Sequence, residues 1–378
     1  MAADTVLIKG GRLLDPQVGL DCVADVTIRE GRISQIAPDI AASVADSVVD
    51  ASGALVTPSL VDLHTHVYWG GTSLGVDPLA YARASSVGLL VDAGSAGPGN
   101  YPGFLSHVIA PCPIPIKAFL HVSFAGIFGF SEHVLVGESE EIRLLAPRDA
   151  LRVIEAHPEH ICGLKVRVGQ YASGTNGAEA LEIALSVAEA ASLPLMAHID
   201  YPPPSYEDVV RQLRPGDILT HAFHPPPNAP HTVAGEVKKA VLDARDRGVL
   251  FDIGHGRASF SFETAEKMLD LGFLPDIISS DVHALCIDGP AFNLLDTMSK
   301  FLHLGVPLAE FVSATTETPR RAIQAPTAKL EVGAKADVSV FQLMSGRHDL
   351  VDGNGGTRRA NSYFEPRAVI SKKGVFAP

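Results

Sequence analysis

The sequence predicts an α/β protein: a (β/α)8 TIM barrel with a small β-sandwich domain formed by the N- and C-terminal segments. Three observations support this prediction. Eight short apolar strands alternate with helical stretches between residues 58 and 327. Eight such units need about 250 residues. Both flanks have strand patterns and are too short to be separate stable domains, so we expect them to pair.

The two flanks share one sequence pattern, in which short alternating strands are separated by glycine and turn residues. The first contains "DTVLIKGGRLLD", "VADVTIREGRISQIAP" and "DSVVDASGALVTPS", and the second contains "LEVGAKADVSVFQL" and "RAVISKKGVFAP". This pattern is typical of short β-strands. We therefore predict one small β domain from residues 1–57 plus 328–378, and a barrel over residues 58–327.

The barrel strands are expected at eight apolar runs. These are residues 61–66, 88–92, 117–123, 162–168, 194–198, 217–221, 248–254 and 276–281. The clearest helices are at 176–192, 233–247 and 262–271, where helix formers carry apolar residues at helical spacing. Residues 94–116 and 124–147 are expected to be loop-rich insertions.

Composition excludes several classes of function. Hydrophobic residues make up 46% and charged residues 19% of the 378 residues, which indicates extensive burial. The chain has no run of eighteen apolar residues and no signal-peptide pattern, so we expect a cytoplasmic protein without a membrane partner. A net charge of −13 without a basic cluster argues against a nucleic-acid partner. The four cysteines form no C-x-x-C pair, which argues against a thiolate metal site.

The candidate functional residues are expected at the ends of the strands, because barrels of this kind place their active sites there. The first strand ends in "VDLHTH", so His64 and His66 are two residues apart and share a face. Each could offer an imidazole nitrogen to one metal ion. The H-x-H motif is common by chance, and only its position at a strand end favours a ligand role.

Three further strands end in a residue that can bind metal. The fifth and sixth end in His198 and His221, and the eighth ends in Asp281. Taken singly, each has an ordinary explanation, a satisfied rim histidine or an aspartate that caps the next helix. Together with His64 and His66 they form a set suited to zinc, several imidazoles and one carboxylate.

The fourth strand, "GLKVRVG", places Lys165 and Arg167 on one face and apolar residues on the other. In isolation it could be an edge strand with a solvated lysine. Within a barrel, Lys165 would point into the mouth, where a metal ion would repel an ammonium group. A lysine carbamylated by CO₂ would instead be an anion with two ligating oxygens, able to bridge two metal ions.

These residues together resemble the amidohydrolase superfamily, in its branch with two metal ions and a carbamylated lysine. The matching motifs are "PSLVDLHTH", "GLKVR", "LMAH", "LTH" and "SSDVH", and the flanks "ASGALVTPSLVDLHTH" and "LEVGAKADVSVF" match as well. The resemblance implies two divalent metal ions, expected to be Zn²⁺. It implies that one binds His64, His66 and Asp281, that the other binds His198 and His221, and that a hydroxide and a CO₂-derived carbamate on Lys165 bridge them.

The resemblance also implies a mechanism and a substrate class. Asp281 would be the general base that takes the proton of the bridging water and passes it to the leaving group. The segments "HVYWGGTSLG", "VDAGSAGPGNYPGF", "HAFHPPPN" and "FDIGHGRASFSF" resemble the dihydroorotase-like deacetylases. We therefore expect hydrolysis of an N-acyl amide or O-acyl ester of a small carboxylic acid by the metal-bridging hydroxide.

Other members of the superfamily match less well. Dihydroorotases typically have an arginine two residues after the second histidine, where this chain has Tyr68. Deaminases lack the bridging lysine and carry an H-x-x-E arrangement, which does not follow His198 or His221. Two alternatives stay open: a cyclic amidohydrolase that opens a dihydroorotate- or hydantoin-like ring, and a catalytically inactive barrel used as a scaffold.

Three residues are candidates for substrate binding. Arg167 could bind a substrate carboxylate or form a structural ion pair. Tyr68 lies in the loop after the first strand and could line the pocket or simply pack. His255 directly follows the seventh strand, which favours contact with the substrate. The expected partner is a small acylated acid, and a homo-oligomer remains open.

Overall fold

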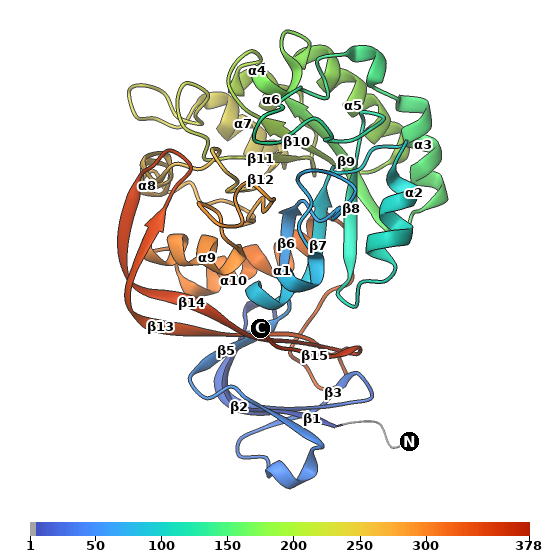
Figure 1. The fold of residues 1–378 in the computed structure, drawn as a ribbon. Helices are drawn as coiled ribbons and strands as arrows, with labels where there is room; N and C mark the ends of the chain where they lie inside the picture. Colours follow the sequence, from blue (N-terminus) through green and yellow to red (C-terminus); the bar gives the residue numbers. More distant parts are fainter. Residues whose placement is uncertain (1–4) are drawn as a thin grey trace.

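A computed structural model describes residues 5–378, so residues 1–4 of the predicted β domain lie outside the described part. The two flanks form one mixed sheet, which curls below the barrel in Figure 1. Its order is β15-β14-β13-β5-β1-β2-β3, with β4 paired to β1. The strands are β1 (Val6–Asp15), β2 (Leu20–Arg29), β3 (Arg32–Ala37), β4 (Ser47–Asp50), β5 (Ala54–Pro58), β13 (Asp337–Val351), β14 (Thr357–Ser371) and β15 (Gly374–Phe376).

Strand β5 joins the two flanks. Val56 pairs with Leu13 of β1 on one side and with Val340 of β13 on the other. All three side chains belong to one buried apolar cluster, together with Ile8 and Ile370. Neither flank could bury this surface alone, which is why residues far apart in the sequence form a single sheet.

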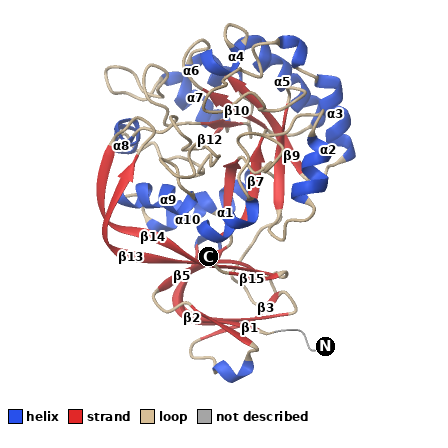
Figure 2. Cartoon of the chain, in the orientation of Figure 1, coloured by secondary structure: helices blue, strands red, loops and turns tan. Residues whose placement is uncertain are grey.

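The barrel sheet contains seven parallel strands, with helices around its outside (Figure 2). The strands are β6 (Leu60–Thr65), β7 (Val87–Ala93), β8 (Ile116–His121), β9 (Ile161–Val168), β10 (Leu195–Ile199), β11 (Ile218–Thr220) and β12 (Leu250–Phe251). The helices are α1 (Pro78–Ser85), α2 (Tyr101–Phe104), α3 (Pro147–Ala156), α4 (Gln170–Ser173), α5 (Gly177–Ala191), α6 (Tyr206–Gln212), α7 (Lys239–Arg247), α8 (Phe262–Asp270), α9 (Leu294–His303), α10 (Leu308–Thr315) and α11 (Glu317–Ala322). None of the helices within residues 5–378 is long and apolar enough to cross a membrane.

The prediction of a regular eighth strand at 276–281 is wrong. Residues 276–282 close the barrel between β12 and β6, but they form only one parallel bridge on each side, Asp252 with Ile277 and Thr65 with Val282. The predicted position in the barrel is therefore correct, whereas the continuous ladder is absent.

A buried carboxylate explains the interrupted ladder. Asp62 of β6 accepts hydrogen bonds from Ser280 N at 2.9 Å and from Ser280 Oγ at 2.6 Å. The Tyr81 hydroxyl donates to the same carboxylate at 2.6 Å. Burial raises the pKa of Asp62 to about 6 despite these hydrogen bonds. A side chain thus takes the place of backbone pairing, which a pattern of apolar residues does not reveal.

Two other predictions differ from the structure. The predicted helix 233–247 begins only at Lys239, because the preceding turn contains Gly235 with a φ of +86°. The predicted loop 94–116 contains α2 and a π-helical turn at Leu105–Ile109, which bury Tyr101 and Phe104. The helices predicted at 176–192 and 262–271 are confirmed as α5 and α8.

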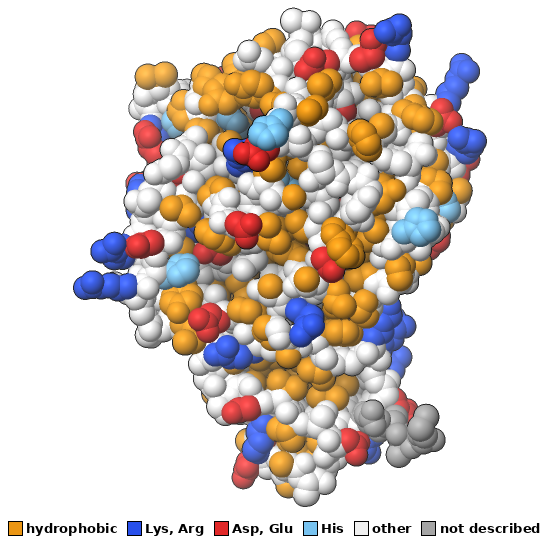
Figure 3. Space-filling view, viewed as in Figure 1, with side chains coloured by type: hydrophobic (Ala, Val, Ile, Leu, Met, Phe, Trp, Pro, Cys, Tyr) orange, Lys and Arg blue, Asp and Glu red, His pale blue; other side chains and the backbone are white. Residues whose placement is uncertain are grey.

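The β13–β14 hairpin is longer than expected and leaves the flank sheet. In Figure 1 it runs up the side of the barrel past α9 and reaches α8. Phe364 packs against Phe311 with ring centroids 5.6 Å apart, and its N–H donates to Ser299 Oγ at 2.9 Å. The hairpin therefore connects the flank sheet to the outside of the barrel. On the face shown in Figure 3, positive and negative side chains are scattered among hydrophobic ones.

Candidate active site

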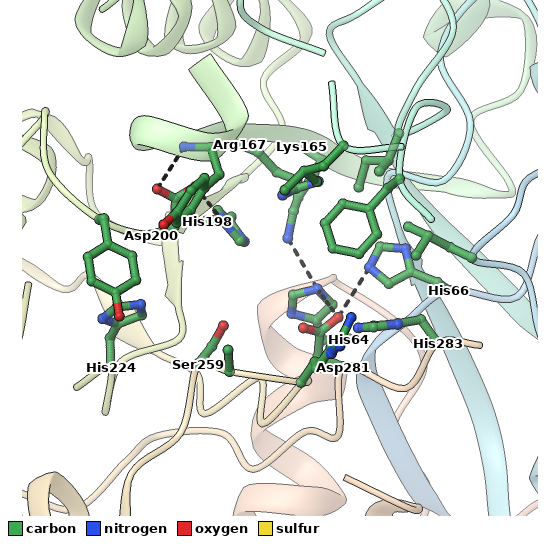
Figure 4. Close-up of a pocket in the computed structure, with 18 residues that line it drawn as sticks. His64, His66, Lys165, Arg167, His198, Asp200, His224, Ser259, Asp281 and His283 are labelled. Carbon is green, nitrogen blue, oxygen red and sulfur yellow. Dashed lines mark hydrogen bonds and ion pairs between the residues drawn. The ribbon is translucent and has the colours of Figure 1, made fainter. Parts of the chain in front are cut away.

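The six residues expected to bind metal lie together at the C-terminal end of the barrel, and Figure 4 shows five of them with labels. His64, Lys165 and His198 stand on β6, β9 and β10. The other three come directly after β6, after β11 and in the eighth extended segment: His66, His221 and Asp281.

The first group consists of His64, His66 and Asp281. Oδ1 of Asp281 lies 3.1 Å from His64 Nε2 and 3.2 Å from His66 Nε2. One ligand atom from each residue fits within 4.8 Å of the others. Two imidazoles and one carboxylate at this spacing can hold a divalent metal ion.

The second group consists of His198 and His221. His221 donates its Nδ1–H to Gly254 O at 2.6 Å, so its Nε2 presents a lone pair, 2.6 Å from His198 Nδ1. Burial holds the pKa of both imidazoles well below its ordinary value, which keeps both rings neutral. Neutral imidazole nitrogens that face each other in a buried place fit a shared cation. His221 Nε2 also lies 4.0 Å from Asp281 Oδ2, which connects the two groups.

Lys165 lies between these groups and is fully buried. Its Nζ is 3.3 Å from His64 Nε2 and 3.3 Å from Met196 Sδ, and within residues 5–378 it forms no ion pair with a carboxylate. Burial lowers the pKa of Lys165 to about 7, which Asp281 opposes and Arg167 assists. An unpaired buried lysine is costly. The lowered pKa makes the neutral amine accessible near neutral pH, and this is the form that can react with CO₂.

Second hydrogen bonds orient the imidazoles of the first group. Thr220 Oγ1 donates to Asp252 at 2.7 Å and therefore accepts from His64 Nδ1, at 2.8 Å. Nδ1 of His66 lies 2.9 Å from Ser95 Oγ. These contacts direct Nε2 of both rings toward Asp281, and such outer contacts fix the tautomer of metal-binding histidines.

The backbone is strained around the cluster. His221 and Asp281 have φ values of +64° and +48°, which non-glycine residues rarely adopt. Glycines allow the close packing: a Cβ added at Gly256 would lie 2.3 Å from Asp281 Oδ2, and one at Gly94 would lie 2.7 Å from Lys165 Cγ. The backbone therefore adopts unfavourable φ values where these groups come together.

A cavity of about 180 Å³ opens above the cluster, and its lining contains both apolar and polar side chains. The apolar residues include Leu74, Ile127, Phe130 and Leu135. The polar residues include Arg167, Asp200, His224, Arg257 and Ser259. Such a cavity suits a small molecule with one apolar end and one polar end.

Of the three predicted substrate residues, the structure places only Arg167 in the cavity wall. Its guanidinium lies 5.0 Å from the centre of the Phe130 ring, and its Nη1 is 3.4 Å from Glu138 Oε2. Glu138 Oε1 lies 3.1 Å from Nε2 of the buried His121. Burial opposes the ionisation of Glu138, but Arg167 and His121 hold its pKa below the ordinary value. Arg167 is thus already paired with an anion.

Tyr68 and His255 are not among the residues that line this cavity. The Tyr68 hydroxyl donates to Asn100 O at 3.2 Å, and its ring packs on Phe104. His255 is buried and turned away, with Nε2 2.9 Å from Lys300 Nζ.

Sequence reasoning missed Asp200 and Arg257, which line the cavity, and the His121–Glu138 pair that contacts Arg167. Glu138 lies in the irregular 124–147 segment, where no periodicity marks it. Arg257 lies two residues after His255, so the same strand-end signal could have identified it.

Comparisons with known proteins agree with this geometry. A family model described as a deacetylase-like composite domain matches residues 330–371. A protein of Brucella anthropi named "Deacetylase" is 34% identical over 94% of this chain and 89% of its own length. "Deacetylase Atu3266" of Agrobacterium fabrum is 34% identical over 92% and 85% of the two chains. A crystal structure of a dihydroorotase superposes with a TM-score of 0.91 at 32% identity and covers 99% of both chains. One of an adenine deaminase gives 0.89 at 26% identity, with the same coverage.

The barrel and its relatives define a hydrolase that acts on carbon–nitrogen bonds. The chain belongs to the dihydroorotase-like deacetylases of the amidohydrolase superfamily. The predicted fold class, family and hydrolase class are confirmed.

Proposed function

We propose that this protein removes the acyl group from an N-acyl amide or O-acyl ester of a small carboxylic acid. The observation that carries the proposal is the buried, unpaired Lys165 among imidazoles that converge with Asp281. The cavity above this cluster, with apolar and polar side chains in its lining, suits a small acylated acid. The relatives named deacetylase, which match over most of the chain, support the same reaction.

The cofactors of this proposal are two divalent metal ions, zinc by the chemistry of the ligands. His64, His66 and Asp281 would hold one ion, His198 and His221 the other, and carbamylated Lys165 both. The neutral Lys165 amine would form its N–C bond with CO₂ and lose one proton. When bound, the ions would supply Lewis acidity for the acyl carbonyl and lower the pKa of water.

The remaining steps depend on residues of the chain. Burial disfavours an ionised Asp281, but the His64, His66 and His221 imidazoles hold its pKa well below the ordinary value. Ionised Asp281 would accept the proton of the attacking water and return it to the nitrogen or oxygen of the leaving group. Phe130 and the other apolar wall residues would exclude bulk water from the acyl group.

Ring opening of a cyclic amide is the second candidate. The dihydroorotase of Geobacter sulfurreducens is 40% identical, but over only 22% of this chain. The dihydroorotase crystal structure matches over 99% of the chain, which supports ring opening as the alternative reaction. Tyr68 stands where dihydroorotases typically carry an arginine and points away from the cavity, so this chain lacks that contact.

A turnover screen tests the proposal. Protein purified with zinc would be assayed for metal content and offered N-acetyl amino acids, O-acetyl hydroxy acids and cyclic ureides. We expect two equivalents of metal and release of acetate from an acetylated acid. Turnover of cyclic ureides alone would favour ring opening. Less than one equivalent of metal without any turnover would favour an inactive scaffold.

A further inference from the structure

We propose that Arg257, and not Arg167, binds the carboxylate of the substrate's acid half, and that the tip of the β13–β14 hairpin positions it. This inference rests on the proposed function, because it requires an anionic substrate. Arg257 follows the seventh barrel strand, whereas the hairpin that would position it belongs to the flank sheet.

Arg167 is poorly suited to a second anion because Glu138 already neutralises it. The two side chains are 8% and 6% exposed, with Arg167 Nη1 3.4 Å from Glu138 Oε2. A substrate carboxylate at this place would become a second buried anion beside Glu138. The electrostatic cost of that arrangement is large in a poorly solvated site. Arg167 is better explained as part of the wall, where it also covers Phe130.

Arg257 has the opposite properties. It is exposed, lines the same cavity and forms no ion pair within the described residues 5–378. Its neighbour Gly256 packs against Asp281, since a Cβ there would lie 2.3 Å from Asp281 Oδ2. Arg257 therefore leaves the backbone one residue from the metal cluster. Ser259 on the same loop points its hydroxyl toward the cavity in Figure 4 and adds a second polar group.

The first half of this loop is fixed to the catalytic segment. His255 N and Gly256 N donate to Ser279 O and Ser280 O, at 3.2 and 2.9 Å. Nε2 of His255 accepts a hydrogen bond from Lys300 Nζ at 2.9 Å. His255 thus anchors the first half of the loop.

The second half is held by the hairpin tip. Gly353 N donates to Phe260 O at 3.0 Å, and the buried Asp352 accepts from Phe262 N at 2.9 Å. Gly353 rests directly on the loop, because a Cβ there would lie 2.7 Å from Ala258 Cα. These contacts fix the backbone on both sides of Arg257. The hairpin therefore helps to set where the Arg257 side chain leaves the backbone.

Kinetics on matched charged and neutral substrates test the inference. The substrates are an N-acetyl amino acid that the wild type hydrolyses and the methyl ester of its carboxylate. Arg257→Met should raise KM for the acid about 10–100-fold, as expected for a lost charged hydrogen bond, and leave KM for the ester unchanged. Arg257→Lys should restore part of the loss. Arg167→Met should lower kcat/KM for both substrates alike, because it strands buried Glu138.

The hairpin is tested separately. Gly353→Ala should shift KM for the acid in the same direction by a smaller factor, with metal content unchanged, because the added methyl displaces the loop. Asn354→Ala, at the exposed neighbouring position, is the matched control and should leave the kinetics unchanged. Thermal unfolding of each variant would verify that it folds.

The outcomes separate this inference from the proposed function. A wild type that hydrolyses no acylated acid would contradict both. Hydrolysis by the wild type, with Arg257→Met affecting acid and ester equally or not at all, would contradict the carboxylate contact alone. A selective rise in KM for the acid in Arg167→Met would assign the carboxylate to Arg167 instead.

Discussion

The two halves of this site are held in different ways. The ligand half stands on strand ends, and the His64, His66 and His221 rings are each oriented by a second polar contact inside the barrel. The half that we propose for substrate binding includes Arg257, on a loop that the sequence-distant hairpin tip holds in place. The difference teaches that strands fix the chemistry while loops and their supports select the substrate. Mutations should therefore affect the two halves in distinct ways.

The largest effect is expected for Lys165→Ala in the ligand half. Loss of the shared ligand should reduce metal content and lower kcat/KM by at least about 10²–10³-fold, the loss seen when one electrostatic contact is removed from an active site. Added short carboxylic acids should partly restore both. Metal analysis and acetate release provide the measurement. Lys117→Ala, in β8 but away from the cluster, is the control, and equal behaviour of the two variants would refute the bridging role.

Asp281→Asn should abolish proton transfer while it preserves the shape of the site. We expect kcat to fall by about 10²–10⁴-fold, the usual contribution of general acid–base catalysis. Rates at saturating substrate and zinc measure this effect. A rate near that of the wild type would show that another group takes the proton.

A smaller effect should follow from changes behind His64. Thr220→Val removes the acceptor of His64 Nδ1 and should weaken metal binding by about 10–100-fold. Competition with a chelator measures the affinity, and excess zinc should restore most of the activity. If excess zinc does not restore the rate, Thr220 acts on something other than metal affinity.

The smallest effect concerns the outer face of the hairpin. Arg358 Nε and Nη2 lie 2.7 and 2.8 Å from the Glu266 carboxylate, but both side chains are partly exposed. Arg358→Ala should cost about 0.2–1 kcal/mol of unfolding free energy and leave KM unchanged. Chemical denaturation and kinetics together test this. A selective rise in KM for anionic substrates would show that the ion pair, and not the hairpin tip, positions the loop.

The ligand residues on strand ends could be predicted from the sequence for a simple physical reason. Alternation along a strand sets the direction of each side chain, so Lys165 could be assigned to the barrel interior from its neighbours alone. The same rule brought His64, His198 and Asp281 to one end of the barrel. It failed to give the regularity of the eighth strand, because the Asp62 carboxylate replaces backbone pairing there.

The loop-borne half was not accessible in the same way. The path of a loop depends on contacts with distant segments, and local sequence does not encode them. Glu138 reaches Arg167 from an irregular insertion, and Gly353 reaches the Arg257 loop from the end of a hairpin whose length was underestimated. Tyr68 and His255 lie outside the cavity lining, because proximity to a strand end does not fix where a loop side chain points.

The central claim is that Lys165 is an anion when the site is loaded. The most direct measurement is ¹³C NMR of protein reconstituted with zinc and ¹³C-bicarbonate. We expect a carbamate carbon signal in the wild type that disappears in Lys165→Ala. A metal-loaded, active wild type without a carbamate signal would contradict the account.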